Sequence, residues 1–299
     1  MNYKSIFNLL GILLAIFSLS FLPPLILSVF YAEPLSGIFL NSFLFLITLG
    51  CLMWFASRQK NLPLNISDGF IITTMFWVVL ACAGSIPFYF FGLNANDAIF
   101  ESVSGITTTG ATVIVGLDEL PKSLLLYRQL LQWIGGMGLI ILAVAVMPTL
   151  GIGGGQLYKM ELPGSHGNQK LTPKITDSAK ALWKIYFGLT IICALLYVLS
   201  GMNLFDAIAH SLSTVAGGGF STHDESIGFF NSGLIEAICI IFMLLSAASF
   251  AVHYAAIFGG KPLKYFYDSE FRFFLSVVIL IALVICIFHS VSNSYADFL

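Results

Sequence analysis

Residues 94–114 read NANDAIFESVSGITTTGATVI and decide the fold, because residues 201–222, GMNLFDAIAHSLSTVAGGGFST, repeat their pattern. When Asp97 is placed on Asp206, the two stretches align without a gap at a constant offset of 109 residues. The identical pairs are Ala98 and Ala207, Ile99 and Ile208, Ser102 and Ser211, Ser104 and Ser213, and Gly110 and Gly219. An internal repeat of this kind predicts that the same local structure occurs twice.

Each copy predicts a short helix followed by an extended strand. A carboxylate suits a helix N-terminus, where it meets free N–H groups and the positive end of the dipole, so Asp97 and Asp206 should open helices. About 12 residues of helix follow, roughly half the depth of a bilayer. The Gly- and Thr-rich strands 107–111 and 216–220 come next. We therefore expect the order span, short helix, strand, span in each copy.

Strands of this composition at membrane depth indicate an aqueous path for cations. Non-helical backbone is tolerated there only where protein or water satisfies its polar groups. The C-terminal end of each short helix presents partial negative charge, and backbone carbonyls can replace a cation's hydration shell. Glycine permits the positive φ that turns successive carbonyls toward one axis, which singles out Gly110 and Gly219. The alternative is that these small residues only let helices pack closely.

The composition identifies the solvent of this chain as a lipid bilayer. Hydrophobic residues make up 58% and charged residues 9%, against about 25% charged in soluble domains, and mean hydropathy is +0.93. A span needs about 20 apolar residues. We expect an all-α polytopic membrane protein with spans at 6–30, 35–57, 69–91, 124–147, 180–200, 233–258 and 271–289.

Basic residues predict the orientation, because Lys and Arg of short loops stay in the cytoplasm. With a cytoplasmic N-terminus, eleven of the thirteen basic residues lie inside, and only Lys122 and Arg128 lie outside. The C-terminus is then external. The net charge of −2 gives no reason to expect a nucleic-acid partner. The five cysteines have no metal or redox spacing, and the glycines at 151–155 lack a following Lys-Ser or Lys-Thr, so we expect no cofactor.

Several longer runs resemble one transporter family, the Trk, Ktr and HKT superfamily, and within it the membrane subunit of bacterial Trk potassium uptake systems. The runs are SVSGITTTGAT, GLDELPKSLLLYRQLLQWIGGMGLIILAVAVMP, MELPG, KLTPKI, AKALWKIYFGLT and STVAGGGFSTHD. The resemblance implies a fold related to the potassium-channel pore, with four units of span, pore helix and span after two extra helices. It also implies potassium uptake, channel-like or coupled to another ion, and no enzymatic activity.

The resemblance further implies the site, partners and location. Potassium would bind backbone carbonyls of a selectivity filter at Thr108, Thr109, Gly110, Gly217, Gly218 and Gly219. The family usually has a bulkier apolar residue where Gly217 stands. The implied partners are the bilayer, a second copy in a homodimer and a cytoplasmic nucleotide-binding, TrkA-like regulatory subunit. The implied location is the bacterial inner membrane.

This reading divides the chain into five parts. They are a two-helix extension (1–65), pore repeat 1 (66–150), a cytoplasmic linker (151–177), pore repeat 2 (178–260) and the first span of an incomplete repeat 3 (261–299). Asp297 resembles the residue that would open a third pore helix. Two loops supply two sides of a four-sided filter, so a second hypothesis is a non-conducting fragment or a partner of a full-length subunit.

Ionisable residues near the two loops leave further alternatives. Glu101 and His210 occupy equivalent positions and either face a vestibule or hold the short helices against neighbouring spans. Arg128 and Gln132, one turn apart, are either a snorkelling pair or a support for a filter strand, and we expect the support. His253 is either a transport group or a packed, hydrogen-bonded histidine, and we expect the latter.

Two further sets of residues indicate a role at the external end of the pore and, as a different class of function, hydrolysis. His223, Asp224 and Glu225 fall at the external mouth, where they either concentrate cations or form a solvated loop. An intramembrane hydrolase would use Ser104 as the nucleophile, with His210 or His253 as its base.

Overall fold

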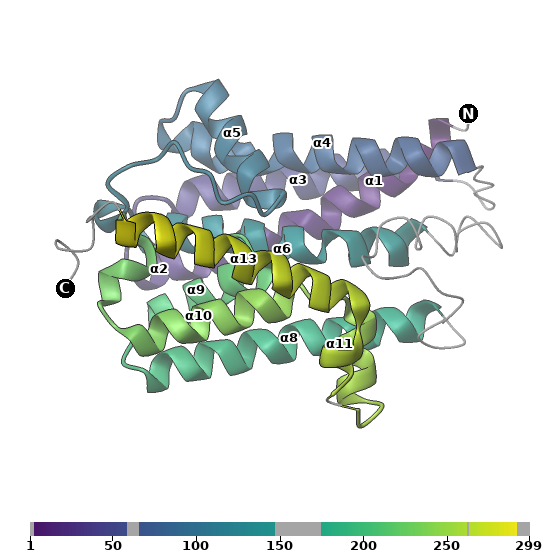
Figure 1. Ribbon diagram of the computed structural model, residues 1–299. Coiled ribbons are helices and arrows are strands. Elements are labelled where there is room, and N and C mark those ends of the chain that lie inside the picture. Colours follow the sequence, from purple (N-terminus) through teal and green to yellow (C-terminus); the bar gives the residue numbers. More distant parts are fainter. Residues whose placement is uncertain (1–2, 59–65, 147–174, 262, 292–299) are drawn as a thin grey trace.

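The computed structural model describes residues 3–58, 66–146, 175–261 and 263–291. Within them it is helical, and Figure 1 shows the long helices running along a common direction, with α5 at one end and the N-terminus at the other. The helices are α1 (Tyr3–Ser18), α2 (Leu22–Phe30), α3 (Ser36–Ala56), α4 (Ile66–Phe91), α5 (Ala95–Ile106), α6 (Lys122–Val146), α8 (Ile175–Leu199), α9 (Leu204–Ala216), α10 (Gly233–Ser246), α11 (Phe250–Ile257), α12 (Lys264–Tyr267) and α13 (Ser269–Val291).

Five of the predicted spans form helices that are long and apolar enough to cross a membrane. They lie at Tyr3–Phe30, Ser36–Ala56, Asp68–Phe91, Ala181–Leu199 and Ser269–Ser290. The first is α1 and α2 joined by a 3-10 turn, Leu19–Phe21, ahead of two prolines at the start of α2. The predicted span 124–147 coincides with α6, which carries buried Arg128, Gln129 and Gln132 among its apolar residues.

The predicted span 233–258, the sixth along the chain, is wrong as a single helix. It breaks between α10 and α11, at residues 247–249. His253 bridges the break, because its Nε2–H donates to the carbonyl of Leu245 at 2.9 Å, which also accepts from the backbone N–H of Ala248 at 3.0 Å. Nδ1 of this ring then accepts from the Tyr265 hydroxyl at 2.7 Å. The expectation of a packed, hydrogen-bonded histidine is confirmed.

The two short helices form as predicted, but the capping residue differs. The Asn94 side chain accepts from the backbone N–H of Asp97 at 3.0 Å, and Asn203 accepts from Asp206 at 2.9 Å. Each aspartate instead lies in the first turn, with a carboxylate oxygen 2.6 Å from the amide nitrogen of its asparagine. Asparagine is a strong N-cap and the aspartate charge still meets the helix dipole, so the two residues share the task.

Helix α6 lies at the centre of the described fold and contacts both short helices, α5 and α9. Glu33, in the loop between α2 and α3, caps the start of α6. Its carboxylate accepts from the backbone N–H groups of Lys122 and Ser123 at 2.8 and 3.1 Å. Tyr127 is fully buried against Phe21 and Phe88, and its hydroxyl donates to the Gly84 carbonyl at 2.7 Å. The N-terminal helices thereby fix the helix that positions both loops.

Two sequence-based predictions fall on other parts of the chain. The linker 151–177, with its glycines at 151–155, lies outside the described residues up to position 174. Asp297 lies outside them as well.

Candidate functional site

The two strands share an unusual backbone at equivalent positions. Thr108 and Gly110 have φ of 55° and 79°, and their counterparts Gly217 and Gly219 have φ of 70° and 84°. Both pairs obey the 109-residue offset of the repeat. Positive φ at every second residue turns successive carbonyls toward one side, whereas an ordinary strand alternates them. The backbone therefore suits a row of oxygen ligands.

Local hydrogen bonds fold each strand back on the end of its helix. In the first copy, the N–H groups of Thr108 and Thr109 donate to the carbonyls of Gly105 and Ser104 at 3.0 and 2.9 Å. In the second, Gly217 and Gly218 bond to residues 214 and 213, both at 3.0 Å. A β-branched residue with positive φ is strained, so these bonds hold Thr108 where the second copy has glycine. Gly217 thus fits the conformation better than a bulkier residue would.

The two strands touch at Gly110. A Cβ atom added to this glycine would lie 1.9 Å from the carbonyl oxygen of Gly218, a separation that real Cβ atoms do not show. Gly218 is itself packed on Gln132, whose side-chain carbon would lie 2.3 Å from an added Cβ. Close approach of backbone therefore requires glycine at Gly110, whereas a side chain at Gly218 would displace the end of Gln132; the strands of the two repeats lie against each other.

A buried ion pair ties the site together. Arg128 Nε lies 2.7 Å from a carboxylate oxygen of Glu101, and both side chains have 0% exposure. The other guanidinium nitrogens donate to the Ser221 carbonyl at 3.1 Å and the Thr112 hydroxyl at 3.0 Å. Thr112 also bonds to Glu101, at 2.9 Å. Arg128 therefore joins the segment after the first strand to the segment after the second.

Gln132 and His210 hold the second strand. The Phe220 N–H donates to Gln132 Oε1 at 3.1 Å. His210 Nδ1–H donates to the Asp206 carbonyl at 2.9 Å, which leaves Nε2 to accept from the Ser221 hydroxyl at 3.0 Å. The support predicted for Arg128 and Gln132 is confirmed. For Glu101 and His210 the buried bonds favour the structural alternative over a vestibule.

A network of side chains joins the loops that follow the two strands. His223 contacts Asp118 through Nδ1 and Asp206 through Nε2, the latter at 3.1 Å, and its ring stacks on Phe229 at 3.5 Å. Asp224 accepts from the N–H groups of residues 116 and 117, both at 3.0 Å. The hydrogen bond from His223 lowers the pKa of the exposed Asp118 carboxyl. Asp224 and His223 therefore connect the loops, whereas Glu225 is exposed and fits the solvated alternative.

The hydrolase alternative finds no catalytic pair. Ser104 donates to the Ala111 carbonyl at 2.5 Å, and within the described residues it has no hydrogen bond to a histidine. The histidines named as bases are engaged elsewhere, His210 with Ser221 and His253 with Leu245 and Tyr265.

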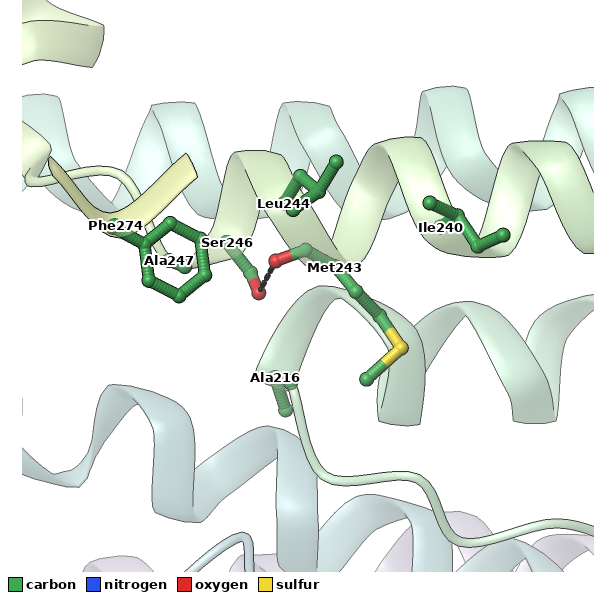
Figure 2. Close-up of a pocket in the computed structure, with 8 residues that line it drawn as sticks. Ala216, Ile240, Met243, Leu244, Ser246, Ala247 and Phe274 are labelled. Carbon is green, nitrogen blue, oxygen red and sulfur yellow. Dashed lines mark hydrogen bonds between the residues drawn. The ribbon is translucent and has the colours of Figure 1, made fainter. Parts of the chain in front are cut away.

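A cavity of about 510 Å³ lies beside the start of the second strand (Figure 2). Its lining comes from the end of α9, from α10 and the break after it, and from Phe274 of α13. The Ser246 hydroxyl on its wall donates to the Met243 carbonyl at 2.8 Å. The space next to Gly217 is therefore mainly apolar.

Sequence reasoning missed two residues of the site, Thr112 and Ser221, and the contact that Phe220 of the predicted strand makes. The offset of 109 places Thr112 on Ser221, and both carry a side-chain hydroxyl directly after the strands. That shared hydroxyl was the available signal. The guanidinium carbon of Arg128 lies 4.3 Å from the centre of the Phe220 ring. Sequence spacing does not reveal this cation–π contact.

Comparison with known proteins assigns the family. The family model described as TrkH, cation transport protein, matches residues 36–299. The Trk system potassium uptake protein TrkH of Vibrio parahaemolyticus is 48% identical over 307 residues, covering 100% of this chain and 63% of that protein. Its namesake in Escherichia coli K12 is 43% identical, covering 98% and 62%.

A solved structure gives the same result for the fold. The crystal structure of the potassium transporter TrkH from Vibrio parahaemolyticus superposes with a TM-score of 0.85 at 46% identity, covering 99% of this chain and 61% of that one. The chain thus spans about three fifths of the length of these relatives. The matches along nearly all of its length show that this chain belongs to the TrkH family of cation transport proteins.

Proposed function

We propose that this chain takes part in potassium uptake across a membrane, through a filter of backbone carbonyls. The observation that carries the proposal is the positive φ at Thr108 and Gly110 and again at Gly217 and Gly219. The proposed potassium-binding carbonyls are those of Thr108, Thr109, Gly110, Gly217, Gly218 and Gly219. Selectivity would follow from the number and spacing of these oxygens, and rapid transfer from weak binding at several sites. The potassium named in the relatives' titles supports the choice of ion.

The two strands supply two sides of the proposed site. Its other sides would come from further residues of a longer chain or from another chain. We propose residues 66–150 and 178–260 as the two pore repeats, after an extension at 1–65, and residues 261–299 as the start of a third. The linker 151–177 would join the first two. The alternative is a non-conducting fragment or a partner of a full-length subunit.

The setting follows from charge and family. We propose the bacterial inner membrane with a cytoplasmic N-terminus, supported by the eleven basic residues that this orientation places inside. A homodimer and a TrkA-like nucleotide-binding subunit are the proposed partners. The relatives are named as transporters, which supports a transport role in place of catalysis.

Growth of uptake-deficient bacteria in limiting potassium tests the proposal. One strain expresses this chain alone, and a second expresses it fused to the C-terminal remainder of the Vibrio parahaemolyticus relative. Growth with the fusion, lost on Gly110→Ala, supports the carbonyl filter. Growth with the fusion that survives Gly110→Ala contradicts the filter assignment, and growth with the short chain contradicts the non-conducting alternative.

A further inference from the structure

An open groove lies where the start of α1 meets the end of α3. It has a volume of about 300 Å³. Its lining consists of Tyr3, Lys4, Phe7, Met53, Ala56 and Ser57. Asn8 donates to the Trp54 carbonyl at 3.2 Å and fixes the two helix ends beside each other. The groove is therefore a built feature of the helix pair, far from the α5 end of the molecule (Figure 1).

The apolar part of the groove suits a hydrocarbon chain. Tyr3 and Phe7 are 62% and 53% exposed. The Ser57 hydroxyl is buried and donates to the Met53 carbonyl, so the floor offers no free polar group there. Both helices belong to predicted spans, so this exposed surface lies in lipid.

Two basic residues lie at or next to the groove: Lys4 lines it, and Arg58 follows the lining residue Ser57 in the chain. Lys4 is exposed and makes no ion pair within the part of the chain that the structure describes. Arg58 is exposed, and its guanidinium carbon lies 5.4 Å from the centre of the Trp54 ring. Asp68, the next acidic residue along the chain, lies at the start of α4 and is buried with 1% exposure. Positive charge therefore faces outward without a surface carboxylate among these residues.

We propose that this groove binds one anionic phospholipid, such as phosphatidylglycerol, from the leaflet at the N-terminal end of the bundle. Its phosphate contacts Lys4 and Arg58, and an acyl chain lies along Phe7 and Met53. Basic pockets between spans recognise anionic headgroups, and aromatic side chains such as Trp54 and Tyr3 favour the headgroup level. The proposal is independent of the filter, because it requires only helices α1 and α3.

Native mass spectrometry of the purified protein with equal amounts of phosphatidylglycerol and phosphatidylcholine tests the site. We expect phosphatidylglycerol adducts to dominate. Each basic residue near an anionic surface contributes roughly fivefold in affinity, so Lys4→Gln with Arg58→Gln should lower phosphatidylglycerol binding by about tenfold or more. Excess inorganic phosphate should leave the adducts in place, because it has no acyl chain.

A matched double variant separates the site from general charge attraction. Lys261→Gln with Lys264→Gln removes two exposed charges near α12 and should leave the preference unchanged. A third variant, Met53→Trp, keeps both charges and fills the groove, so it should also reduce binding. Equal adducts of the two lipids on the unaltered protein, or equal losses from both charge variants, would overturn the proposal.

Discussion

Replacing Gly110 by alanine should damage ion selection, because the added methyl group meets the backbone of the other strand. The added Cβ would lie 1.9 Å from the Gly218 carbonyl oxygen, whereas real Cβ contacts stay above 3.0 Å. One strand therefore has to move by about 1.1 Å, the difference between these two distances. The φ of 79° adds about 1–2 kcal/mol of backbone strain for a residue with a side chain.

The consequence for selectivity follows from ion coordination. Each loss of about 1.4 kcal/mol in the preferential coordination of potassium lowers its preference over sodium tenfold. A carbonyl moved by about 1 Å no longer contacts the ion as before, so we expect the potassium-to-sodium ratio to fall by at least that factor. The assay is uptake of rubidium and sodium tracers into proteoliposomes that contain the fusion with the Vibrio parahaemolyticus relative.

Two glycines serve as matched controls for this substitution. Gly116 has φ of 76° and Gly219 has φ of 84°, and neither has an atom within 4 Å of an added Cβ. Gly116→Ala lies in the following loop and imposes strain alone, so its ratio should stay near that of the unaltered protein. Gly219→Ala imposes strain inside the second strand and should give an intermediate effect. An unchanged ratio in Gly110→Ala, or equal ratios in all three variants, would refute the reasoning.

Three further predictions concern the groups that hold the site. Arg128→Met leaves the Glu101 charge buried and unpaired, so it should cost about 3–5 kcal/mol in thermal unfolding, and adding Glu101→Met should recover part of that loss. An additive double variant would contradict the pairing. Asn203→Ala removes a helix cap and should cost about 0.5–2 kcal/mol in the same measurement, which an unchanged stability would exclude. The bond to His223 lowers the pKa of Asp118, so the contribution of this carboxylate to stability is present above its ordinary pKa of 3.8 and is lost as pH falls through the lowered value. The stability of Asp118→Asn and of the unaltered protein, measured against pH, should therefore converge at low pH. Parallel profiles would count against this contribution.

The repeat made the short helices and strands predictable, because local structure follows from local sequence. The offset of 109 located both α5 and α9, and the glycines identified the positive φ at 110 and 219. Thr108 was within the predicted strand, but its own positive φ could not be read from a residue type that avoids it. Its conformation comes from the bonds that fold the strand back on its helix.

Contacts between the repeats and the break in the predicted span 233–258 could not be predicted. Arg128 meets the Ser221 carbonyl across 93 residues of sequence, and Asp224 meets residue 116 across 108. Spacing says nothing about such pairs. The break at 247–249 lies in a mainly apolar run in which Ser246 and Ser249 are the nearest polar residues, so hydropathy shows one span, and the backbone shows where α10 ends.

The most direct test of the carbonyl filter is anomalous diffraction from crystals of the fusion protein grown in rubidium, which scatters anomalously and stands in for potassium. The account predicts rubidium peaks between the two strands, within coordinating distance of carbonyl oxygens at 108–110 and 217–219. Ordered strands without such a peak, or rubidium bound only by side chains elsewhere, would contradict it.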